Sequence, residues 1–343
     1  MTPNEIKSNI TLLMYSYDRH EYLARAFHYW GQTEFNLLIA DDSLTAFPNA
    51  QIPKNIKYFH MRGVSQYERI RALSKKVKTA YVLLVTDDDF FFPSGIIESL
   101  NFLISNNQYS AAQGQFIRFD PQTPSLEWYW DYKYACSYEM TEENFQDRLQ
   151  SAYKPPLFHY CYAVMKKNAL DTGLDLLKDV TNQASSTYEL SFLISIMIHG
   201  KYKTLPTAFA AREKQEKRWT AIYFNEWMSA NESLGFEKWN DNFINSIMQN
   251  SNHTYREAWS LTNDLNTQLS DIATLKLRKL RKLRKLKRDS FALKKTSLIT
   301  SARKLYRYFR MLEFKYKNFG INFAKIKQFN DEWNAIKKIL FLF

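Results

Sequence analysis

The sequence contains few cysteines and no long apolar run. Only Cys136 and Cys161 occur among 343 residues, so a disulfide framework is excluded, and two isolated thiols are typical of a protein core in a reducing compartment. No stretch reaches the roughly 18 consecutive apolar residues of a membrane-spanning helix, and the N-terminus MTPNEIKSNI lacks the basic start and apolar run of a secretion signal. We therefore expect a cytoplasmic protein.

Common cofactor signatures are also absent. The chain has no Gly-x-Gly-x-x-Gly segment and no Gly-Lys-Ser/Thr loop, which argues against dinucleotide oxidoreductases and P-loop NTPases. Its six histidines are scattered without the spacing of metal ligands, so no zinc site is assigned. The function must be sought in other residue types.

Positive charge is concentrated at one end of the chain. Residues 271–343 contain 21 basic residues (Lys and Arg) and 5 acidic ones (Asp and Glu). The first 270 residues contain 26 basic and 30 acidic residues. The sequence therefore predicts a mildly acidic body with a strongly basic tail, and the two parts have to be interpreted separately.

Apolar runs and amphipathic segments alternate in the first hundred residues. Strands are predicted in NITLLMYSYDR, FNLLIADDS, NIKYFHM and TAYVLLVTDDD, and helices in HEYLARAFHYWGQ, SQYERIRALSKKVK and PSGIIESLNFLISNN. Residues from there to about 160 are rich in Trp and Tyr and are predicted to be extended and irregular. HYCYAVMKKNAL predicts a strand that enters a helix, and STYELSFLISIMIHGKYKTLP a buried helix that stops at Gly200 before another strand. The alternation indicates an α/β fold with a mostly parallel sheet.

Carboxylates follow two of the predicted strands. Asp87, Asp88 and Asp89 end one of them, and Asp41 and Asp42 end another, so both groups fall where a parallel sheet binds its ligands. Neighbouring like charges repel by roughly 1 to 4 kcal/mol per pair at a protein surface. Such a cluster has two alternative explanations. It forms a solvated turn, or it holds a divalent cation with its oxygen atoms.

These segments together resemble the family 2-type nucleotide-sugar glycosyltransferases of the GT-A fold. LLMYSYDRHEYLARAFHYWGQTEFNLLIADDS resembles the opening of that family, and YERIRALSKKVKTAYVLLVTDDDFFFPSG resembles its Asp-x-Asp strand end. The resemblance covers about residues 10–210. It implies a GT-A (Rossmann-like) domain over residues 1–220. We expect residues 221–270 to be a helical continuation of the body, and the charge pattern predicts a basic amphipathic helical tail over residues 271–343.

The resemblance implies a divalent cation and a nucleoside-diphosphate sugar donor. Asp87 and Asp89 match the two carboxylates of the motif and are the expected ligands of Mn²⁺ or Mg²⁺, with Asp88 between them at the donor. A pyrophosphate brings about two negative charges, so a carboxylate approaches it only across a cation. Asp42 matches the residue that contacts the nucleoside, and a turn-forming aspartate is the alternative.

Further donor contacts are expected near the first strand and on the helix before the acidic triplet. Three residues at the end of the first strand should border the nucleotide: Tyr15, Ser16 and Tyr17. Asp18 and Arg19, which follow them, fit a local ion pair. Arg69 and Arg71 would reach phosphate bidentately, or else form a solvated helix face.

An inverting transferase needs a base near the acceptor hydroxyl. In the family an Asp, usually preceded by Glu, opens a helix about three turns before a Gly. Here Glu189 stands eleven residues before Gly200, and Tyr188 replaces the preceding acid. The resemblance therefore makes Glu189 the candidate base, while a Glu favoured by the helix dipole is the alternative.

Two further motifs would contact the acceptor or the diphosphate. Gln215, Arg218 and Trp219 match the Gln-x-x-Arg-Trp pattern of synthases in this superfamily, in which Arg approaches the diphosphate and Trp stacks on the acceptor sugar. Trp128 and Trp130 would offer a platform for sugar C–H faces, or belong to the core. Without membrane-spanning helices there is no channel for a processive synthase, so single or few additions are expected.

The basic tail has a repeating pattern. LKLRKLRKLRKLKR, residues 275–288, holds nine Lys or Arg, and its leucines recur every three residues. Because each step turns the apolar stripe back by about 60°, the pattern disfavours a coiled coil and suits a helix that lies on an anionic membrane. Packing onto the body, in cis or in a dimer, is the second interpretation, and nucleic-acid binding through RKLYRYFR is the least favoured.

The sequence therefore predicts a metal-dependent inverting glycosyltransferase that acts on a glycan or lipid-linked acceptor in cell-surface polysaccharide assembly, at the inner face of the cytoplasmic membrane. A nucleotidyltransferase on a similar sheet is one alternative, although YSYDR offers no phosphate loop or Lys signature after the first strand. A non-catalytic scaffold or nucleic-acid-binding protein is the other.

Overall fold

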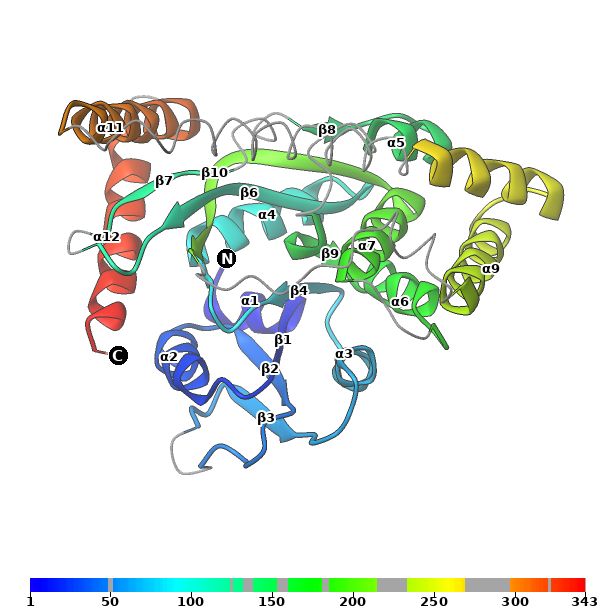
Figure 1. The fold of residues 1–343 in the computed structure, drawn as a ribbon, viewed down its shortest axis with the longest axis horizontal. Helices are drawn as coiled ribbons and strands as arrows, with labels where there is room; N and C mark the ends of the chain where they lie inside the picture. Colours follow the sequence, from blue (N-terminus) through cyan, green and yellow to red (C-terminus); the bar gives the residue numbers. More distant parts are fainter. Residues whose placement is uncertain are drawn as a thin grey trace.

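A computed structural model gives the fold of the chain (Figure 1). It describes residues 1–48, 52–123, 126–131, 138–152, 160–180, 185–214, 233–268, 297–319 and 322–342.

The described strands form a single sheet in the order β3-β2-β1-β4-β9-β6-β10-β5, with β7 paired to β6 and β8 to β10. Its longer strands are β1 (Ile10–Ser16), β2 (Asn36–Asp41), β3 (Ile56–His60), β4 (Tyr81–Val85), β6 (Tyr109–Phe119) and β10 (Lys201–Glu213). The short strands are β5 (Phe90–Phe91), β7 (Trp128–Trp130), β8 (Glu139–Met140) and β9 (Val164–Lys166).

The long strands all run in the same direction. Strands β1 to β4 pair in parallel, and so do β6 and β10. Strand β9 is antiparallel to both β4 and β6, so β6 and β10 point the same way as β4. The carboxyl ends of β1, β2, β4 and β10 therefore meet at one edge of the sheet.

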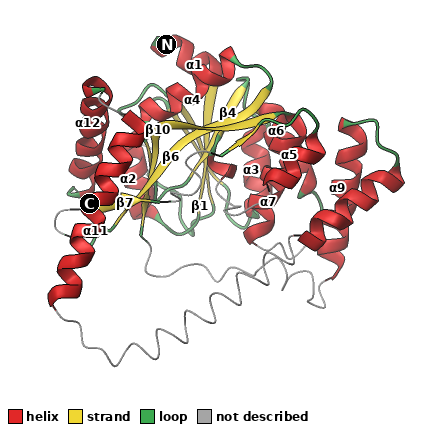
Figure 2. Ribbon diagram, turned by 90° about the horizontal axis from the view of Figure 1, so that it is seen from above, coloured by secondary structure: helices red, strands yellow, loops and turns green. Residues whose placement is uncertain are grey.

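Helices cover both faces of this sheet (Figure 2). The described helices include α1 (Pro3–Asn9), α2 (His20–Trp30), α3 (Gln66–Ser74), α4 (Pro93–Ser105), α5 (Phe145–Ala152), α6 (Lys167–Leu176), α7 (Ser185–His199), α9 (Ser233–Asn250), α11 (Ser297–Phe319) and α12 (Phe323–Leu340), and residues 255–268 are also helical. One core cluster joins the sheet to α2, α4, α11 and α12, and a second joins it to α3, α5, α6, α7 and α9. The predicted α/β class, a mostly parallel sheet flanked by helices, is confirmed.

Most predicted elements occur where the sequence places them. Pro93 opens α4, and α7 ends at His199 before Gly200, whose φ of +156° favours glycine. The main difference is β6, an eleven-residue buried strand in the region expected to be irregular. Its sequence YSAAQGQFIRF is buried on both faces, yet small and amide side chains hide the apolar signal of a strand.

The described part of the basic tail packs against the body. Phe314 of α11 and Phe329, Trp333 and Ile336 of α12 belong to the same core as the sheet. The carboxylate of Glu332 accepts hydrogen bonds from the Ser94 backbone N–H at 2.9 Å and from its hydroxyl at 2.6 Å, so α12 caps the first turn of α4. Packing onto the body, the second interpretation of the tail, is therefore observed for α12 and for one face of α11. Residues 275–288 lie outside the described residues.

No helix in the described part of the chain is long and apolar enough to cross a bilayer.

Candidate active site

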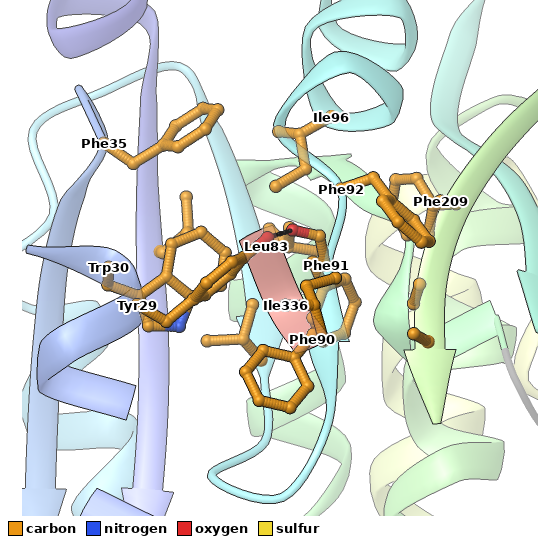
Figure 3. Packing of buried hydrophobic residues seen from close by; sticks show 14 of the residues in the cluster. Tyr29, Trp30, Phe35, Leu83, Phe90, Phe91, Phe92, Ile96, Phe209 and Ile336 are labelled. Atoms are coloured by element: carbon orange, nitrogen blue, oxygen red, sulfur yellow. Dashed lines mark hydrogen bonds between the residues drawn. The ribbon is translucent and has the colours of Figure 1, made fainter. Parts of the chain in front are cut away.

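Three phenylalanines fix the chain directly after the acidic triplet (Figure 3). Phe90, Phe91 and Phe92 are all buried in the core, where each side chain contributes about 1.5 to 3 kcal/mol by leaving water. The Tyr29 hydroxyl donates a 2.7 Å hydrogen bond to the carbonyl of Phe91. The core therefore holds the triplet in place, despite the repulsion between its carboxylates.

Asp87 points back to the end of β1. Its carboxylate accepts hydrogen bonds of 2.7 Å from the Ser16 hydroxyl and 2.7 Å from Arg19, which also lies 3.3 Å from Asp88. Burial, reinforced by the charge of Asp88, raises the pKa of Asp87 to about 6, although Arg19 and Ser16 act in the opposite direction. Arg19 is thus a residue of this site.

The expected ion pair between Asp18 and Arg19 is wrong. Asp18 has a positive φ of 48°, its backbone N–H donates to the Ser43 hydroxyl, and its carboxylate accepts from the Leu44 N–H. This turn directs Arg19 towards the acidic triplet instead.

Asp89 is held by the end of β10. It accepts hydrogen bonds from Arg212 at 3.2 Å and from the Glu213 backbone N–H at 3.0 Å. The register explains this contact, because Ala211 pairs with Phe90 in the antiparallel β5–β10 ladder. Burial raises the pKa of Asp89 to about 7, with Arg212 opposing the shift and Asp88 adding to it.

A second layer of charge surrounds these carboxylates. Arg25 contacts Glu213 at 2.7 Å and donates to the carbonyl of Asp88 at 3.1 Å. The Tyr22 ring lies under the guanidinium groups of Arg19 and Arg25, with centroid distances of 4.3 and 4.7 Å. The cluster as a whole contains four carboxylates and three guanidinium groups: Asp87, Asp88, Asp89, Glu213, Arg19, Arg25 and Arg212.

The donor set of this cluster fits a hard divalent cation that shares its coordination sphere with phosphate. Among the described residues, no three His, Cys, Asp or Glu side chains converge as metal ligands. Mg²⁺ and similar ions at phosphate sites need only one or two carboxylates, since water and phosphate oxygens supply the rest. The cluster keeps an excess of negative charge, and the pKa values of Asp87 and Asp89 are raised, so a cation would stabilise both carboxylates in their ionised form.

Asp42 and Arg69 join the ends of β1 and β2. Arg69 is buried, donates to the carbonyl of Ser16, and places a guanidinium nitrogen 3.7 Å from Asp42 Oδ2. Asp42 Oδ1 accepts a 2.5 Å hydrogen bond from the N–H of Gly63, whose φ of +75° is one that glycine adopts without strain. The neighbouring Asp41 is fully buried and is bound by the hydroxyl of Tyr58 at 2.7 Å, which gives it a structural role.

Arg71 does not reach this edge. Its guanidinium donates to the hydroxyl of Tyr67 at 2.9 Å and to Asp175 of α6 at 3.1 Å. Because these contacts join α3 to α6, the expected approach of Arg71 to the donor is not seen in the structure.

Glu189 of α7 and two aspartates of the acidic triplet act electrostatically on Tyr15. The charge of Glu189 helps to raise the pKa of Tyr15, a shift that is caused mainly by burial and to which Asp87 and Asp88 also contribute. Glu189 likewise raises the pKa values of Cys161 and Tyr162, both dominated by burial. The guanidinium of Arg212 lies 5.5 Å from the centroid of the Tyr162 ring. Arg212 therefore contacts both Asp89 and Tyr162, a residue whose pKa Glu189 helps to raise.

The remaining expected site residues have different outcomes. Tyr17 is exposed beyond the end of β1. Trp128 and Trp130 are buried under α11, each with its ring centroid 5.4 Å from that of Phe314, so the proposed sugar platform is wrong and the core alternative holds. The motif residues Gln215, Arg218 and Trp219 lie outside the described residues.

The raised pKa values of Asp87 and Asp89 predict how stability depends on pH. In the unfolded chain these carboxyls titrate near 3.8, whereas the folded protein retains their protons to about pH 6 and about pH 7. Between these limits the folded state binds more protons, so their contribution to stability falls as pH rises. We expect a double Asp87→Asn/Asp89→Asn variant to gain melting temperature relative to the wild type between about pH 5 and about pH 7.5. A difference in melting temperature that stays constant over this range would contradict the burial of these charges.

Comparisons with known proteins give a limited result. No protein-family model matches the chain, and no curated protein matches it. Among solved structures, a crystal structure of S. aureus TarS residues 1–349 is 10% identical over 77% of this chain and 90% of that chain, with a TM-score of 0.43. The same TarS fragment in complex with UDP-GlcNAc is 11% identical over the same shares, with a TM-score of 0.40. A longer TarS structure, of which this chain covers 55%, gives a TM-score of 0.39 at 10% identity. At these scores the likeness carries no argument about activity.

Proposed function

We propose that this protein transfers a sugar from a nucleoside diphosphate to a hydroxyl group, with the help of a divalent cation. The observation that carries the proposal is the pair of buried carboxylates, Asp87 and Asp89, at the carboxyl end of β4. Both have a raised pKa and both are anchored by neighbouring strand ends, which is the placement expected for a metal that a diphosphate must share. The resemblance of residues 10–210 to GT-A glycosyltransferases supports the same reaction.

Different residues at this edge of the sheet would bind different parts of the donor. Mn²⁺ or Mg²⁺, held by Asp89 and Asp87, would stabilise the charge of the leaving diphosphate. Asp42 accepts hydrogen bonds from the nucleoside, and Arg69 keeps Asp42 and the end of β1 together. Arg19, whose side chain is one-third exposed, is the guanidinium best able to turn from Asp87 to the phosphates when a cation replaces it.

Glu189 is the proposed base, and the proposed stereochemical outcome is inversion. A carboxylate on the acceptor side takes the proton of the attacking hydroxyl, so that displacement at the anomeric carbon proceeds in one step. The acceptor is proposed to be a glycan or a lipid-linked sugar that receives one or a few residues.

Replacing Glu189 by glutamine tests this role. We expect Glu189→Gln to lower the turnover number by about 10² to 10⁴-fold, because it removes the proton acceptor and keeps the side-chain shape. Donor affinity, measured by calorimetry with the nucleoside diphosphate and Mn²⁺, should stay within about twofold of the wild type. Glu68→Gln in the exposed first turn of α3 is the matched control and should retain full turnover. A Glu189→Gln enzyme with normal turnover would refute the assignment.

The reaction itself is tested with a panel of nucleoside-diphosphate sugars. Thermal-shift measurements with nucleoside diphosphates and Mn²⁺ should show stabilisation that a chelator abolishes, since a ligand that binds only the folded state stabilises it by RT ln(1 + L/Kd), where L is the free ligand concentration. Release of the diphosphate from a sugar donor would support glycosyl transfer, whereas release of pyrophosphate from a nucleoside triphosphate would identify the nucleotidyltransferase alternative. Failure to bind any nucleotide would leave the non-catalytic scaffold.

The proposed location is the cytoplasm. Cys161 is a buried free thiol, and its pKa is raised by burial, as expected of an inert core cysteine in a reducing compartment.

A further inference from the structure

One face of α11 packs against the body of the protein. Phe314 is fully buried between Trp128, Trp130 and Phe329, and Asn318 is buried one turn later. The guanidinium of Arg310 donates to the carbonyl of Trp130. These contacts fix the rotation of the helix about its axis, so its opposite side must face outwards.

That opposite side is apolar. Tyr308, Phe309, Leu312 and Tyr316, here named the outer face of α11, are 53%, 58%, 44% and 72% exposed. At about 100° per residue they fall within an arc of about 100°, opposite Phe314 and Asn318. Single exposed apolar side chains are common on soluble proteins, but four on one arc of a helix indicate a surface that meets a partner.

The helix itself is strongly positive. The 23 residues of α11 include six Lys and Arg. In the described part, Lys315 and Lys317 lie on the two sides of the outer face, and Glu313 is the only acid of α11. A partner that meets this surface must therefore combine an apolar interior with a negative exterior.

The position of α11 suits a broad, flat partner. Figures 1 and 2 both show the helix at the periphery, and in Figure 2 one end of it extends beyond the rest of the fold. Tyrosine and phenylalanine at the boundary between water and hydrocarbon combine an apolar ring with, in tyrosine, a polar tip. A nucleic acid would gain little from the aliphatic Leu312 in the middle of the arc, since bases stack on aromatic rings.

We propose that the outer face of α11 docks the protein on the surface of an anionic lipid bilayer. The helix lies parallel to the membrane, with its aromatic side chains among the acyl chains and its cations at the lipid headgroups. In contrast, α12 buries Phe329 and Trp333 in the protein core. The proposal does not depend on the glycosyl-transfer reaction, because it concerns a surface distant in sequence from the acidic triplet.

Sedimentation of the full-length protein with lipid vesicles tests the proposal. We expect binding to phosphatidylcholine vesicles that contain phosphatidylglycerol, weaker binding to pure phosphatidylcholine, and a decrease as salt is raised. The triple variant Tyr308→Ser/Phe309→Ser/Tyr316→Ser should lower the partition coefficient by about tenfold or more. Tyr255→Ser/Trp259→Ser, which alters two residues that are 59% and 50% exposed on another helix, is the matched control and should bind like the wild type.

A second variant and a second measurement keep the test decisive. Leu312→Glu places a negative charge, of the same sign as the lipid headgroups, on the outer face of α11. It should weaken vesicle binding at least as much as one serine substitution and should leave the melting temperature unchanged. Wild-type protein that does not bind anionic vesicles, or a triple variant that binds them equally well, would overturn the proposal. Light scattering that shows a wild-type dimer which the triple variant loses would also overturn it, because a second copy of the chain would then cover this face.

Discussion

Asp89→Asn will lower the rate of glycosyl transfer by at least about a hundredfold, which corresponds to roughly 2.7 kcal/mol of transition-state stabilisation. The substitution keeps the size of the side chain, and its amide oxygen still accepts the hydrogen bond from the Glu213 N–H. It removes the negative charge that would hold a cation against the departing diphosphate. Loss of rate without loss of fold is therefore the expected result.

Three measurements separate this effect from misfolding. The melting temperature of Asp89→Asn at about pH 8 should equal or exceed that of the wild type, because the variant no longer buries a charge whose pKa is raised. Mn²⁺ should give the variant little further thermal shift in the presence of nucleoside diphosphate. Asp175→Asn, which changes a mostly exposed carboxylate paired with Arg71, is the control and should keep full activity. Sugar transfer at the wild-type rate by Asp89→Asn would rule out the proposed role of the triplet.

The sequence was sufficient to predict the edge of the sheet on which the site lies. Three of the first four strands, β1, β2 and β4, are mainly apolar runs of five to seven residues, whereas β3 is a short mixed segment, and the residues after the strands reveal where they end. Parallel pairing then brings Asp42 and the acidic triplet to one edge without any knowledge of side-chain contacts.

The basic partners of the triplet could not be predicted in this way. Arg19 meets Asp87 across 68 positions of sequence, and Arg212 meets Asp89 across 123 positions. The second contact depends on the β5–β10 register, which a two-residue strand does not reveal. A positive φ at Asp18 turns Arg19 inwards, and nothing in the residue types distinguishes this turn from a local ion pair.

Aromatic side chains posed a different difficulty. Trp128 and Trp130 alternate with Tyr129, a pattern that serves equally for a sugar platform and for a buried strand. The structure resolves the question because β7 pairs with β6 and is covered by α11. The charge pattern did not reveal which residues of the tail pack against the body. In α12, lysines flank the buried Phe329 and Trp333 and obscure the apolar face of the helix.

Trp333→Ala will destabilise the whole protein by about 3 to 5 kcal/mol. The Trp333 side chain is buried in α12, and its ring centroid lies 5.6 Å from that of Phe119 on β6. A tail that only touched membranes would tolerate the change, because nothing in the catalytic body would then depend on it. Urea unfolding followed by circular dichroism measures the difference, and Phe323→Ala, at a position 82% exposed on the same helix, should cost less than about 0.5 kcal/mol.

The loss at Trp333 should also reach the candidate site, because α12 supports the chain that follows the acidic triplet. Phe329 packs against Phe92 with a centroid distance of 5.4 Å, and Glu332 caps α4 through Ser94. A less tightly packed α12 would therefore free the segment that anchors the acidic triplet. Nucleotide-induced thermal stabilisation should weaken in Trp333→Ala but not in Phe323→Ala. If α12 instead melted in a separate early transition, with nucleotide binding intact, the helix would be an appendage and its contacts with α4 would have no bearing on the site.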